Sequence, residues 1–329
     1  MMYAMKIAGV LSILVLLAVA VIAQAQQPTK VPRIGYLSAT SPSANVGRIE
    51  AFRLGLRELG YVEGKNIVIE WRYAEGKFDR LPALVSELVR LKVDVIVTSG
   101  PQSTRVAKEA TVTIPIVMGF DPDPVGGGFV ASLARPGGNI TGLSTLSPEL
   151  SGKQLELLKE IVPKLSRVAV VGDSNEPGNA QALKEVELAA GAFKVQLQYL
   201  DVLNLKDIEH SFQSASKQRA GAVLVLAGPV MAAHRTEVVN LAAKNRLPAM
   251  YFRSDFVEAG GLMTYSVNYN DLARGAATYV DKILKGAKPA DLPVEQPKKF
   301  ELIINLKTAK QIGLTIPPNA LARADKVIK

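Results

Sequence analysis

Residues 121–144 read DPDPVGGGFVASLARPGGNITGLS and follow a short apolar run, residues 114–120. That run predicts a buried strand, so the carboxylates of Asp121 and Asp123 stand where the strand ends. In an open α/β sheet, ligands bind beyond the carboxyl ends of the strands. We therefore expect this stretch to border a binding site and, at Gly142-Leu143-Ser144, to carry the chain from one lobe to a second.

Glycine and proline divide the rest of this stretch. Pro124 and three glycines lead into residues 129–134, which we predict to form a brief helix. Arg135-Pro136-Gly137-Gly138 predicts a turn, and residues 140–144 predict one more short strand. We therefore expect the first series of strands to end here.

The first 25 residues form a segment of a different kind. Lys6 precedes an apolar run over residues 7–23, which ends in Ala23-Gln24-Ala25. A basic start, an apolar centre and a small-x-small ending are typical of a secretory signal peptide, so we predict cleavage after Ala25. An uncleaved membrane anchor is the alternative, because the apolar run lies at the lower length limit for a bilayer span.

The sequence contains no cysteine. Disulfides, thiolate catalysis and cysteine metal sites are therefore excluded, as is the lipid-bearing cysteine that anchors many exported bacterial receptors. A predicted signal peptide without such an anchor indicates a free periplasmic protein. The formal net charge is +9, but the basic residues are spread along the chain. Export and this spread both argue against a nucleic-acid partner.

From Val31 the chain alternates strand and helix patterns, which predicts parallel sheets covered by helices. Removing the signal leaves about 300 residues, enough for two domains of about 150. The predicted strands are 33–38, 66–73, 93–98 and 114–120 in a first series, then 168–171, 195–200, 222–226, 248–252 and 262–267 in a second. The predicted helices are 45–59, 81–91, 102–110, 149–162, 180–191, 205–217, 231–245 and 270–285.

The end of the chain is less regular. A linker over residues 286–293 precedes an edge-strand pattern over residues 300–306, and we predict a surface tail around Pro317-Pro318. Breaks at residues 267–270 and 289–297 allow the chain to cross between lobes twice more. The predicted fold is therefore α/β, with two Rossmann-like lobes of parallel sheets joined by a three-crossover hinge. The N-terminal lobe is expected to hold residues 26–143 and 268–290, and the C-terminal lobe residues 144–267 and 291–329.

The sequence lacks the motifs of an enzyme or a metal site. Its two histidines, His210 and His234, lie in helix patterns without a partner at ligand spacing. No Gly-x-Ser-x-Gly elbow occurs, and residues 60–66 have the wrong glycine spacing for a phosphate loop. No Gly-x-Gly-x-x-Gly follows the first strand, so dinucleotide binding lacks support. We therefore expect no catalytic residue, no metal and no cofactor.

Polar loops at the ends of predicted strands are the candidates for ligand binding. Ser38 and Thr40 follow the first strand, while Ser99, Gln102 and Ser103 follow the third and open a helix. Free backbone N–H groups and hydroxyls at a helix start suit a carboxylate. The alternative is that Ser99 or Ser103 only caps the helix.

Further candidates come from the fourth strand and from the second lobe. Asp123 can pair with a ligand ammonium or cap the helix that follows it. Asp173 and Asn175 come directly after a strand of the second lobe. Tyr251 and Tyr265 close two further strands and can stack on a flat ligand, or else lie in the core with their hydroxyls satisfied.

Several blocks of the sequence are similar to a known family. They are LGYVEGKN at residues 59–66, DPVG at 123–126, SLARPGGN at 132–139, FVEAGGLM at 256–263, YVDKILKGAKPADLPVEQP at 279–297 and FELIINLKTA at 300–309. Through these blocks the chain resembles the tryptophan/tyrosine-type ABC transporter substrate-binding proteins over residues 33–329. Phe120-Asp121-Pro122 departs from that family, in which small residues are common at this place.

The resemblance implies a type I periplasmic-binding fold that closes on a small solute and delivers it to a membrane permease driven by an ATPase. Characterised members take aromatic amino acids, so the implied ligand is a small polar or aromatic, amino-acid-like solute. We expect a monomer. Two other classes stay open at this point: a sensory receptor that presents its closed form to a membrane kinase, and an exported α/β enzyme.

Overall fold

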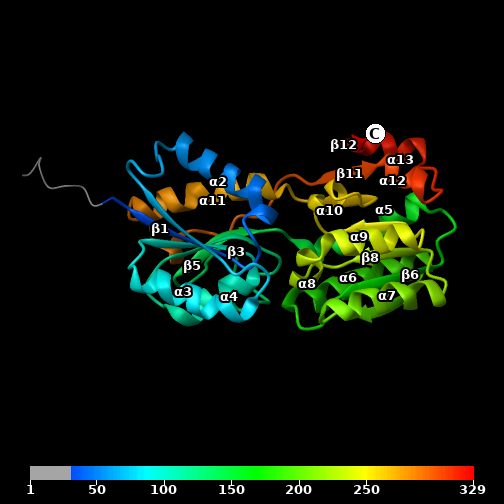
Figure 1. Ribbon diagram of the computed structural model, residues 1–329, viewed down its shortest axis with the longest axis horizontal. Coiled ribbons are helices and arrows are strands. Elements are labelled where there is room, and N and C mark those ends of the chain that lie inside the picture. Colours follow the sequence, from blue (N-terminus) through cyan, green and yellow to red (C-terminus); the bar gives the residue numbers. More distant parts are fainter. Residues whose placement is uncertain (1–30) are drawn as a thin grey trace, which may run out of the picture. The chain divides into compact units, whose positions relative to one another are not determined.

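The computed structural model describes residues 31–329, of which Arg33–Lys329 form one compact unit. The predicted signal peptide, residues 1–25, lies outside the described residues. Two α/β lobes follow one another, each with a sheet between layers of helices (Figure 1). Parallel pairing dominates both sheets, which confirms the predicted fold class.

The first sheet holds five parallel strands. They are β1 (Arg33–Ser38), β2 (Val68–Tyr73), β3 (Val95–Ser99), β4 (Ile116–Asp121) and β5 (Ile140–Ser144), in the spatial order β2-β1-β3-β4-β5. Its helices are α2 (Val46–Glu58), α3 (Leu81–Arg90), α4 (Pro101–Ala110) and, from much later in the chain, α11 (Tyr269–Leu284), with short 3-10 turns at η1 (Ser43–Asn45) and η2 (Phe78–Arg80). Helices α2 and α11 cover one face of the sheet, and α3 and α4 cover the other (Figure 1).

The apolar spacing of the sequence explains both covered faces. Phe52 and Leu56, four residues apart on α2, pack with Tyr36 of β1 in one core. Leu88 of α3 packs with Leu37 in the other core. Because successive side chains of a strand point to opposite faces, the neighbours Tyr36 and Leu37 each serve a different core.

The second sheet has seven strands in the order β12-β11-β10-β9-β8-β6-β7. They are β6 (Arg167–Gly172), β7 (Gln196–Asp201), β8 (Ala222–Val225), β9 (Ala249–Tyr251), β10 (Met263–Ser266), β11 (Glu301–Asn305) and β12 (Lys326–Ile328). Helices α5 (Ser147–Ile161), α6 (Pro177–Phe193), α12 (Leu306–Gln311) and α13 (Pro318–Arg323) cover one face, and α7 (Leu205–Lys217), α8 (Pro229–Ala233), α9 (Arg235–Lys244) and α10 (Ser254–Glu258) the other. The pairing of β10 with β11 is antiparallel.

The predicted surface tail around Pro317-Pro318 is wrong. Pro318 opens α13, a position where its missing N–H costs nothing. Ala320 of that helix is buried in the core, and Lys326–Ile328 add a strand parallel to β11. The chain end is therefore built into the second sheet.

The first crossover lies slightly later than predicted. Gly142-Leu143-Ser144 belong to β5, where Gly142 pairs with Met118 at a φ of +138°. A Cβ on Gly142 would stand 2.2 Å from the carbonyl oxygen of Met118, so this pairing requires glycine. The chain leaves the first sheet only after Ser144.

Two more connections join the lobes. After β10, Val267 and Tyr269 enter the core of the first lobe, where α11 packs. After α11 and the 3-10 turn η3 (Pro289–Asp291), Glu295 hydrogen-bonds through its backbone to Gly142 and Ser144 before the chain enters β11. Three connecting segments of the chain therefore link the two lobes. The segment after Ser144 and the segment around Glu295 lie side by side at the end of β5.

The predicted brief helix over residues 129–134 is absent. The backbone N–H groups of Phe129 and Val130 both bond to the carbonyl of Pro124, and that of Ala131 bonds to Pro136. A segment this short, enclosed between glycines and a proline, cannot offset the cost of nucleating a helix. It forms turns instead, which bury Phe129 and Val130 beneath the first sheet.

Candidate functional site

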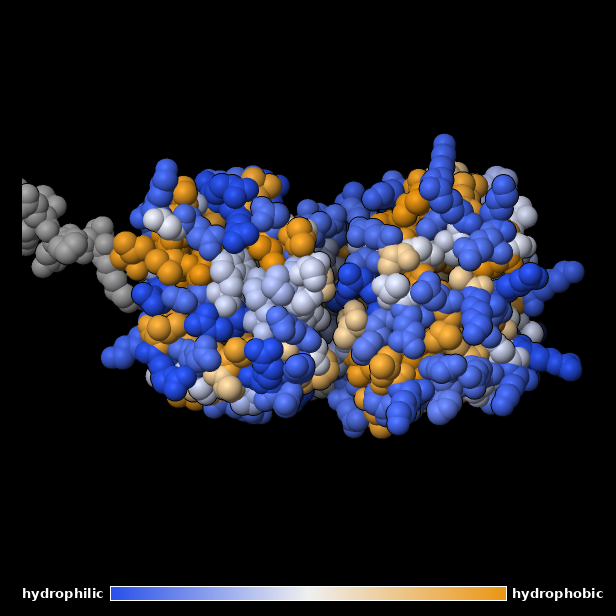
Figure 2. Space-filling model, viewed as in Figure 1, coloured by the Kyte–Doolittle hydropathy of each residue, from blue (hydrophilic) through white to orange (hydrophobic). Residues whose placement is uncertain are grey.

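A cavity lies where the carboxyl ends of the strands of both lobes meet. It contains about 590 Å³ of empty space, part of which is open to solvent. Figure 2 shows a hollow between the lobes. The first lobe lines the cavity with Ala39, Thr40, Arg48, Phe78, Ser99, Gly100, Pro101, Gln102, Phe120 and Pro122, and the second with Glu176, Ala227, Gly228, Pro229, Ala232, Phe252 and Arg253; Tyr269 begins α11.

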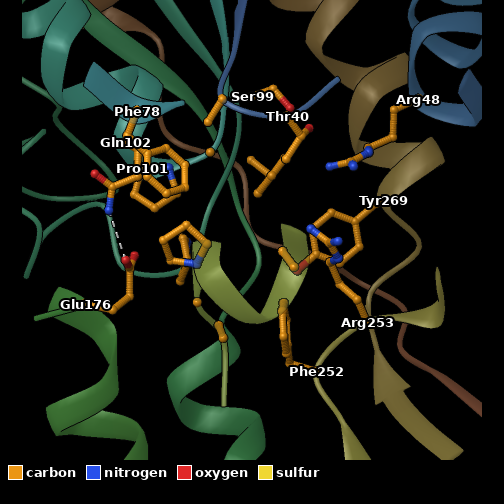
Figure 3. Close-up of a pocket in the computed structure, with 18 residues that line it drawn as sticks. Thr40, Arg48, Phe78, Ser99, Pro101, Gln102, Glu176, Phe252, Arg253 and Tyr269 are labelled. Atoms are coloured by element: carbon orange, nitrogen blue, oxygen red, sulfur yellow. Dashed lines mark hydrogen bonds between the residues drawn. The ribbon is translucent and has the colours of Figure 1, made fainter. Parts of the chain in front are cut away.

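The strand ends explain how these residues come together. Ser99 ends β3, and Gly100 then turns at a φ of +101°, where a Cβ would stand 3.3 Å from the ring of Phe120. Pro101 starts α4, which presents Gln102 to the cavity (Figure 3). On the second lobe, Glu176 lies between β6 and α6. This is the position that open α/β sheets use for ligands.

One end of the cavity is cationic. Arg48 of α2, Arg253 after β9 and Tyr269 of α11 lie on the same side in Figure 3. Arg253 donates from Nε at 3.0 Å and from Nη2 at 2.5 Å to the two carboxylate oxygens of Asp255. This bidentate ion pair between the buried Arg253 and the half-buried Asp255 satisfies Arg253 within the protein.

Arg48 differs from its neighbour. Its side chain is buried, yet its guanidinium makes no salt bridge within residues 31–329 and donates only to the carbonyl of Ala44, at 3.4 Å. It also lies over the ring of Phe120, 5.5 Å from the ring centre. Burial, followed by the nearby charge of Arg253, lowers the pKa of Arg48 to about 10, although Tyr36 and the charge of Asp255 act in the opposite direction. A buried cation without a carboxylate partner favours an anionic group in the cavity.

The opposite side of the cavity is acidic. Glu176 is 4% exposed, and its Oε2 accepts a hydrogen bond from Nε2 of Gln102 at 3.2 Å (Figure 3). This bond joins α4 of the first lobe to the start of α6 in the second. Burial raises the pKa of Glu176 to about 7, against the lowering effect of Gln102.

A second buried carboxylate stands behind this side. Asp121 is 1% exposed; its Oδ1 accepts from the backbone N–H of Asp123, and its Oδ2 has no hydrogen-bond partner in the described part of the chain. Burial raises the pKa of Asp121 well above its ordinary value, and Glu176 adds to the shift. Burial of Asp121 therefore favours its neutral form.

Aromatic rings form the walls between the two ends. Phe78 comes from η2, Phe120 from β4 and Phe252 from the residue after β9. Phe252 is held by the ring of Phe256, whose centre lies 5.1 Å away. Such walls suit a flat apolar body.

Three predicted ligand residues, Thr40, Ser99 and Gln102, line the cavity. Ser38 lies behind Thr40, with a distance of 3.3 Å between their hydroxyl oxygens. Ser103 is fully buried, and its hydroxyl has no partner among the described residues. Neither Ser99 nor Ser103 caps α4, which has no side-chain cap.

Other predicted residues serve turns rather than the cavity. Asp123 accepts from the backbone N–H of Gly126 at 2.8 Å, so it caps the turn after Pro124, and it does not line the cavity. Asp173 likewise accepts from the backbone N–H of Asn175 at 2.8 Å. Asn175 is exposed. Short polar side chains that bond to the backbone two or three residues ahead are typical of turns.

The two tyrosines do not face the cavity, which corrects the prediction that they stack on a ligand. Tyr251 is 1% exposed and stacks on Phe256 with 5.1 Å between ring centres. Tyr265 packs against Phe300, 5.8 Å away, on the other face of the sheet. Strand alternation is the reason: Tyr251 points into the core, whereas Phe252 and Arg253 follow the strand end and reach the cavity.

Sequence reasoning missed most of the charged and aromatic lining. Arg253 and Glu176 follow strands, so the rule that found Ser99 applies to them as well. Arg48 and Tyr269 lie on helices, where no spacing distinguishes them from ordinary surface or core residues. No group of three or more histidines, aspartates and glutamates able to hold a metal occurs within residues 31–329. None of the helices in that range is long and apolar enough to cross a bilayer.

Two lobes that enclose a cavity with an unpaired cation, aromatic walls and a carboxylate define a receptor for small solutes. Residues 40–328 match the family described as ABC transporter substrate binding protein, and the chain belongs to this family. The family is a class of binding proteins and not a class of enzymes.

Relatives of known structure and sequence agree with this assignment. A tyrosine-binding protein of Clostridioides difficile is 27% identical over 269 residues, which are 80% of this chain and 76% of the relative. A Streptococcus pneumoniae ABC domain in complex with L-Trp is 26% identical, with a TM-score of 0.84 over 90% of this chain and 99% of that one. A ligand-free, open substrate-binding protein from Clostridium difficile is 25% identical, with a TM-score of 0.69 over 91% and 100%. The resemblance to the tryptophan/tyrosine type is thereby confirmed.

Proposed function

We propose that this protein is the periplasmic receptor of an ABC importer and binds an aromatic amino acid between its lobes. The observation that carries the proposal is Arg48, a buried cation without a carboxylate partner in the described chain, which faces a cavity walled by aromatic rings. An amino-acid carboxylate supplies the missing anion, and a flat side chain fills the space between Phe78, Phe120 and Phe252.

The names of the relatives support the same ligand class. One is a tyrosine-binding protein and another is a complex with L-Trp. Within the cavity, the hydroxyls of Thr40 and Ser99 add polar contacts for the amino-acid head group.

The proposed mechanism is closure of a hinge around the ligand, where contacts to both lobes favour the closed state. The moving bodies are the first lobe, with β1 to β5 and α11, and the second lobe, with β6 to β12. The TM-score is higher against the L-Trp complex than against the open, ligand-free protein, although identity and coverage are nearly equal. This difference supports a lobe arrangement close to the ligand-bound one, as does the bond between Gln102 and Glu176.

The cellular setting follows from the family and from the leader sequence. We propose that the signal peptide is removed after Ala25 and that the free monomer delivers its solute to a permease driven by an ATPase. Family membership supports the transporter, and the apolar leader with its Ala23-Gln24-Ala25 ending supports export.

Isothermal titration of residues 26–329 tests this function. L-tyrosine, L-tryptophan and L-phenylalanine are titrated beside tyramine and tryptamine, which lack the carboxylate. We expect saturable binding of at least one aromatic amino acid, no binding of the amines, and about 2.7 kcal/mol of stabilisation at 100 times the Kd. Binding of none of the amino acids, or equal binding of acids and amines, contradicts the proposal.

A further inference from the structure

We propose that Glu176 is a specificity-determining residue that accepts a hydrogen bond from the ring of the ligand, at the end remote from the ligand's carboxylate. The receptor then prefers rings that carry an O–H or N–H donor, such as phenol or indole, over a plain benzyl group. This inference rests on the proposed function, because it assumes that an aromatic amino acid occupies the cavity.

The placement of the charges is the first observation. Arg48 and Arg253 lie on one side of the cavity and Glu176 on the opposite side, and Phe252 lies between them (Figure 3). A ligand that places its carboxylate at Arg48 therefore extends its ring toward Glu176. The group at the tip of the ring is the one that meets this carboxylate.

The hydrogen bonds of Glu176 are the second observation. Its Oε2 accepts from Gln102, whereas its Oε1 has no hydrogen-bond partner among residues 31–329. No lysine or arginine of the described chain forms a salt bridge with it, although Arg105 is near enough to act on its charge. A carboxylate that lines a cavity and has one oxygen without a donor can accept a further hydrogen bond there. We expect a donor on the ligand ring to form a hydrogen bond with Oε1 of Glu176.

The α-ammonium group of the ligand is the competing partner for Glu176. In an amino acid the ammonium and the carboxylate sit on the same carbon, so both lie at the same end of the molecule. With the carboxylate at Arg48, the ammonium lies on that side too, near the hydroxyls of Thr40 and Ser99. The opposite positions of Arg48 and Glu176 therefore favour a ring donor over the ammonium.

The ratio of affinities for L-tyrosine and L-phenylalanine tests the inference, because these ligands differ only in the phenolic hydroxyl. In the wild type at pH 8, above the pKa of Glu176, we expect L-tyrosine to bind roughly 10- to 100-fold more tightly, the range for a hydrogen bond to a charged group. In Glu176→Ala the ratio should fall to within about 3-fold of one. Glu187→Ala is the control, an exposed glutamate on α6, the helix that follows Glu176, and should keep the wild-type ratio.

Glu176→Gln keeps the shape and one neutral acceptor, so it should retain part of the preference even if the alanine variant folds poorly. Equal affinities in the wild type overturn the inference, as does a Glu176→Ala protein that loses affinity for both ligands equally and keeps their ratio. The latter result would assign Glu176 to the ammonium and leave the proposed function intact. Failure of the wild type to bind any aromatic amino acid removes the proposed function and the inference together.

Discussion

The two ends of the cavity carry opposite charges, and they differ in how those charges are compensated. At the cationic end, Arg253 has both carboxylate oxygens of Asp255, whereas Arg48 has only a carbonyl at 3.4 Å. At the acidic end, Glu176 has one amide donor from Gln102. The cavity therefore contains one charge that the protein satisfies and two that it leaves incomplete.

The pKa values follow the same division. Burial lowers the pKa of Arg253, but Asp255 more than restores it, so the pKa lies above its ordinary value. Burial shifts Arg48 and Glu176 toward their neutral forms, to pKa values of about 10 and about 7. Buried charges are stable when they are paired. We therefore infer that Arg253 stabilises the fold and that Arg48 and Glu176 bind the ligand.

The largest expected effect comes from breaking the satisfied pair. Asp255→Ala leaves Arg253 buried without its partner, which should lower the free energy of unfolding by about 3–5 kcal/mol. Urea unfolding measures this loss. Glu50→Ala is the control, since it removes the ion pair with the more exposed Arg53 and should cost about 1 kcal/mol or less. Equal losses of unfolding free energy in Asp255→Ala and Glu50→Ala would contradict a stabilising role for the ion pair of Arg253.

Removing the charge of Arg48 should lower ligand affinity without lowering stability. Arg48→Met removes a buried charge that lacks a carboxylate partner in the described chain, so stability should be unchanged or higher. Affinity for L-tyrosine should fall by about 2 kcal/mol or more, roughly 30-fold, because the ligand carboxylate loses its cation. Calorimetric titration and thermal unfolding measure the two quantities. Arg57→Met, exposed on the same helix, should change neither, and a stability loss without an affinity loss in Arg48→Met would make Arg48 structural.

The raised pKa of Glu176, at the acidic end of the cavity, makes the free energy of unfolding depend on pH. The folded protein holds a proton on Glu176 up to pH about 7, whereas the unfolded chain releases it near the ordinary glutamate pKa of 4.5. The folded state therefore binds more protons between these values, so the contribution of Glu176 to stability is present below pH about 4.5 and is lost as the pH rises to about 7. Up to about 3 kcal/mol is involved at 1.36 kcal/mol per pKa unit.

Glu176→Gln should accordingly remove part of the decline in stability between pH 5 and pH 8, measured by urea unfolding. The pKa of Asp121 shifts in the same direction, chiefly through burial, so Asp121 keeps most of its own contribution in this variant and loses only the part that the charge of Glu176 supplies. Asp173, whose charge raises the pKa of Glu176, and Arg105, whose charge lowers it, stay in place. Glu187→Gln is the exposed control, and identical pH profiles for the wild type and Glu176→Gln would refute the shift.

The fold was predictable because periodicity determines it. Buried strands such as β3 and β8 are continuous apolar runs, and helices such as α3 repeat their leucines at three and four residues. The predictions failed where local sequence has two solutions. Pro317-Pro318 can end a chain or open a helix, and only the core contacts of α13 decide between them.

The residues that line the cavity were only partly predictable, because local sequence does not show which charged side chains become buried. The rule of polar residues at strand ends found Thr40, Ser99 and Gln102. Arg48 looks like an ordinary surface residue of a helix, and nothing local shows that the second lobe will cover it. Its lack of a carboxylate partner is a fact of three-dimensional contacts, and those contacts make it the strongest candidate for the ligand carboxylate.

The smallest expected effect concerns the bond between the lobes. Gln102→Ala removes the amide that reaches Glu176 at 3.2 Å, so it weakens the closed state by about 1 kcal/mol. Affinity for L-tyrosine and L-phenylalanine should fall together by about 5-fold, with their ratio preserved, because the bond lies between lobes and not between protein and ligand.

A double-mutant cycle isolates this contact. If the bond acts in closure, adding Gln102→Ala to Glu176→Ala should not weaken L-phenylalanine binding any further, since the acceptor is already gone. An additional loss in the double variant would mean that Gln102 touches the ligand itself. Gln102 would then be a ligand-binding residue. Its bond to Glu176 would no longer explain how the lobes are held closed.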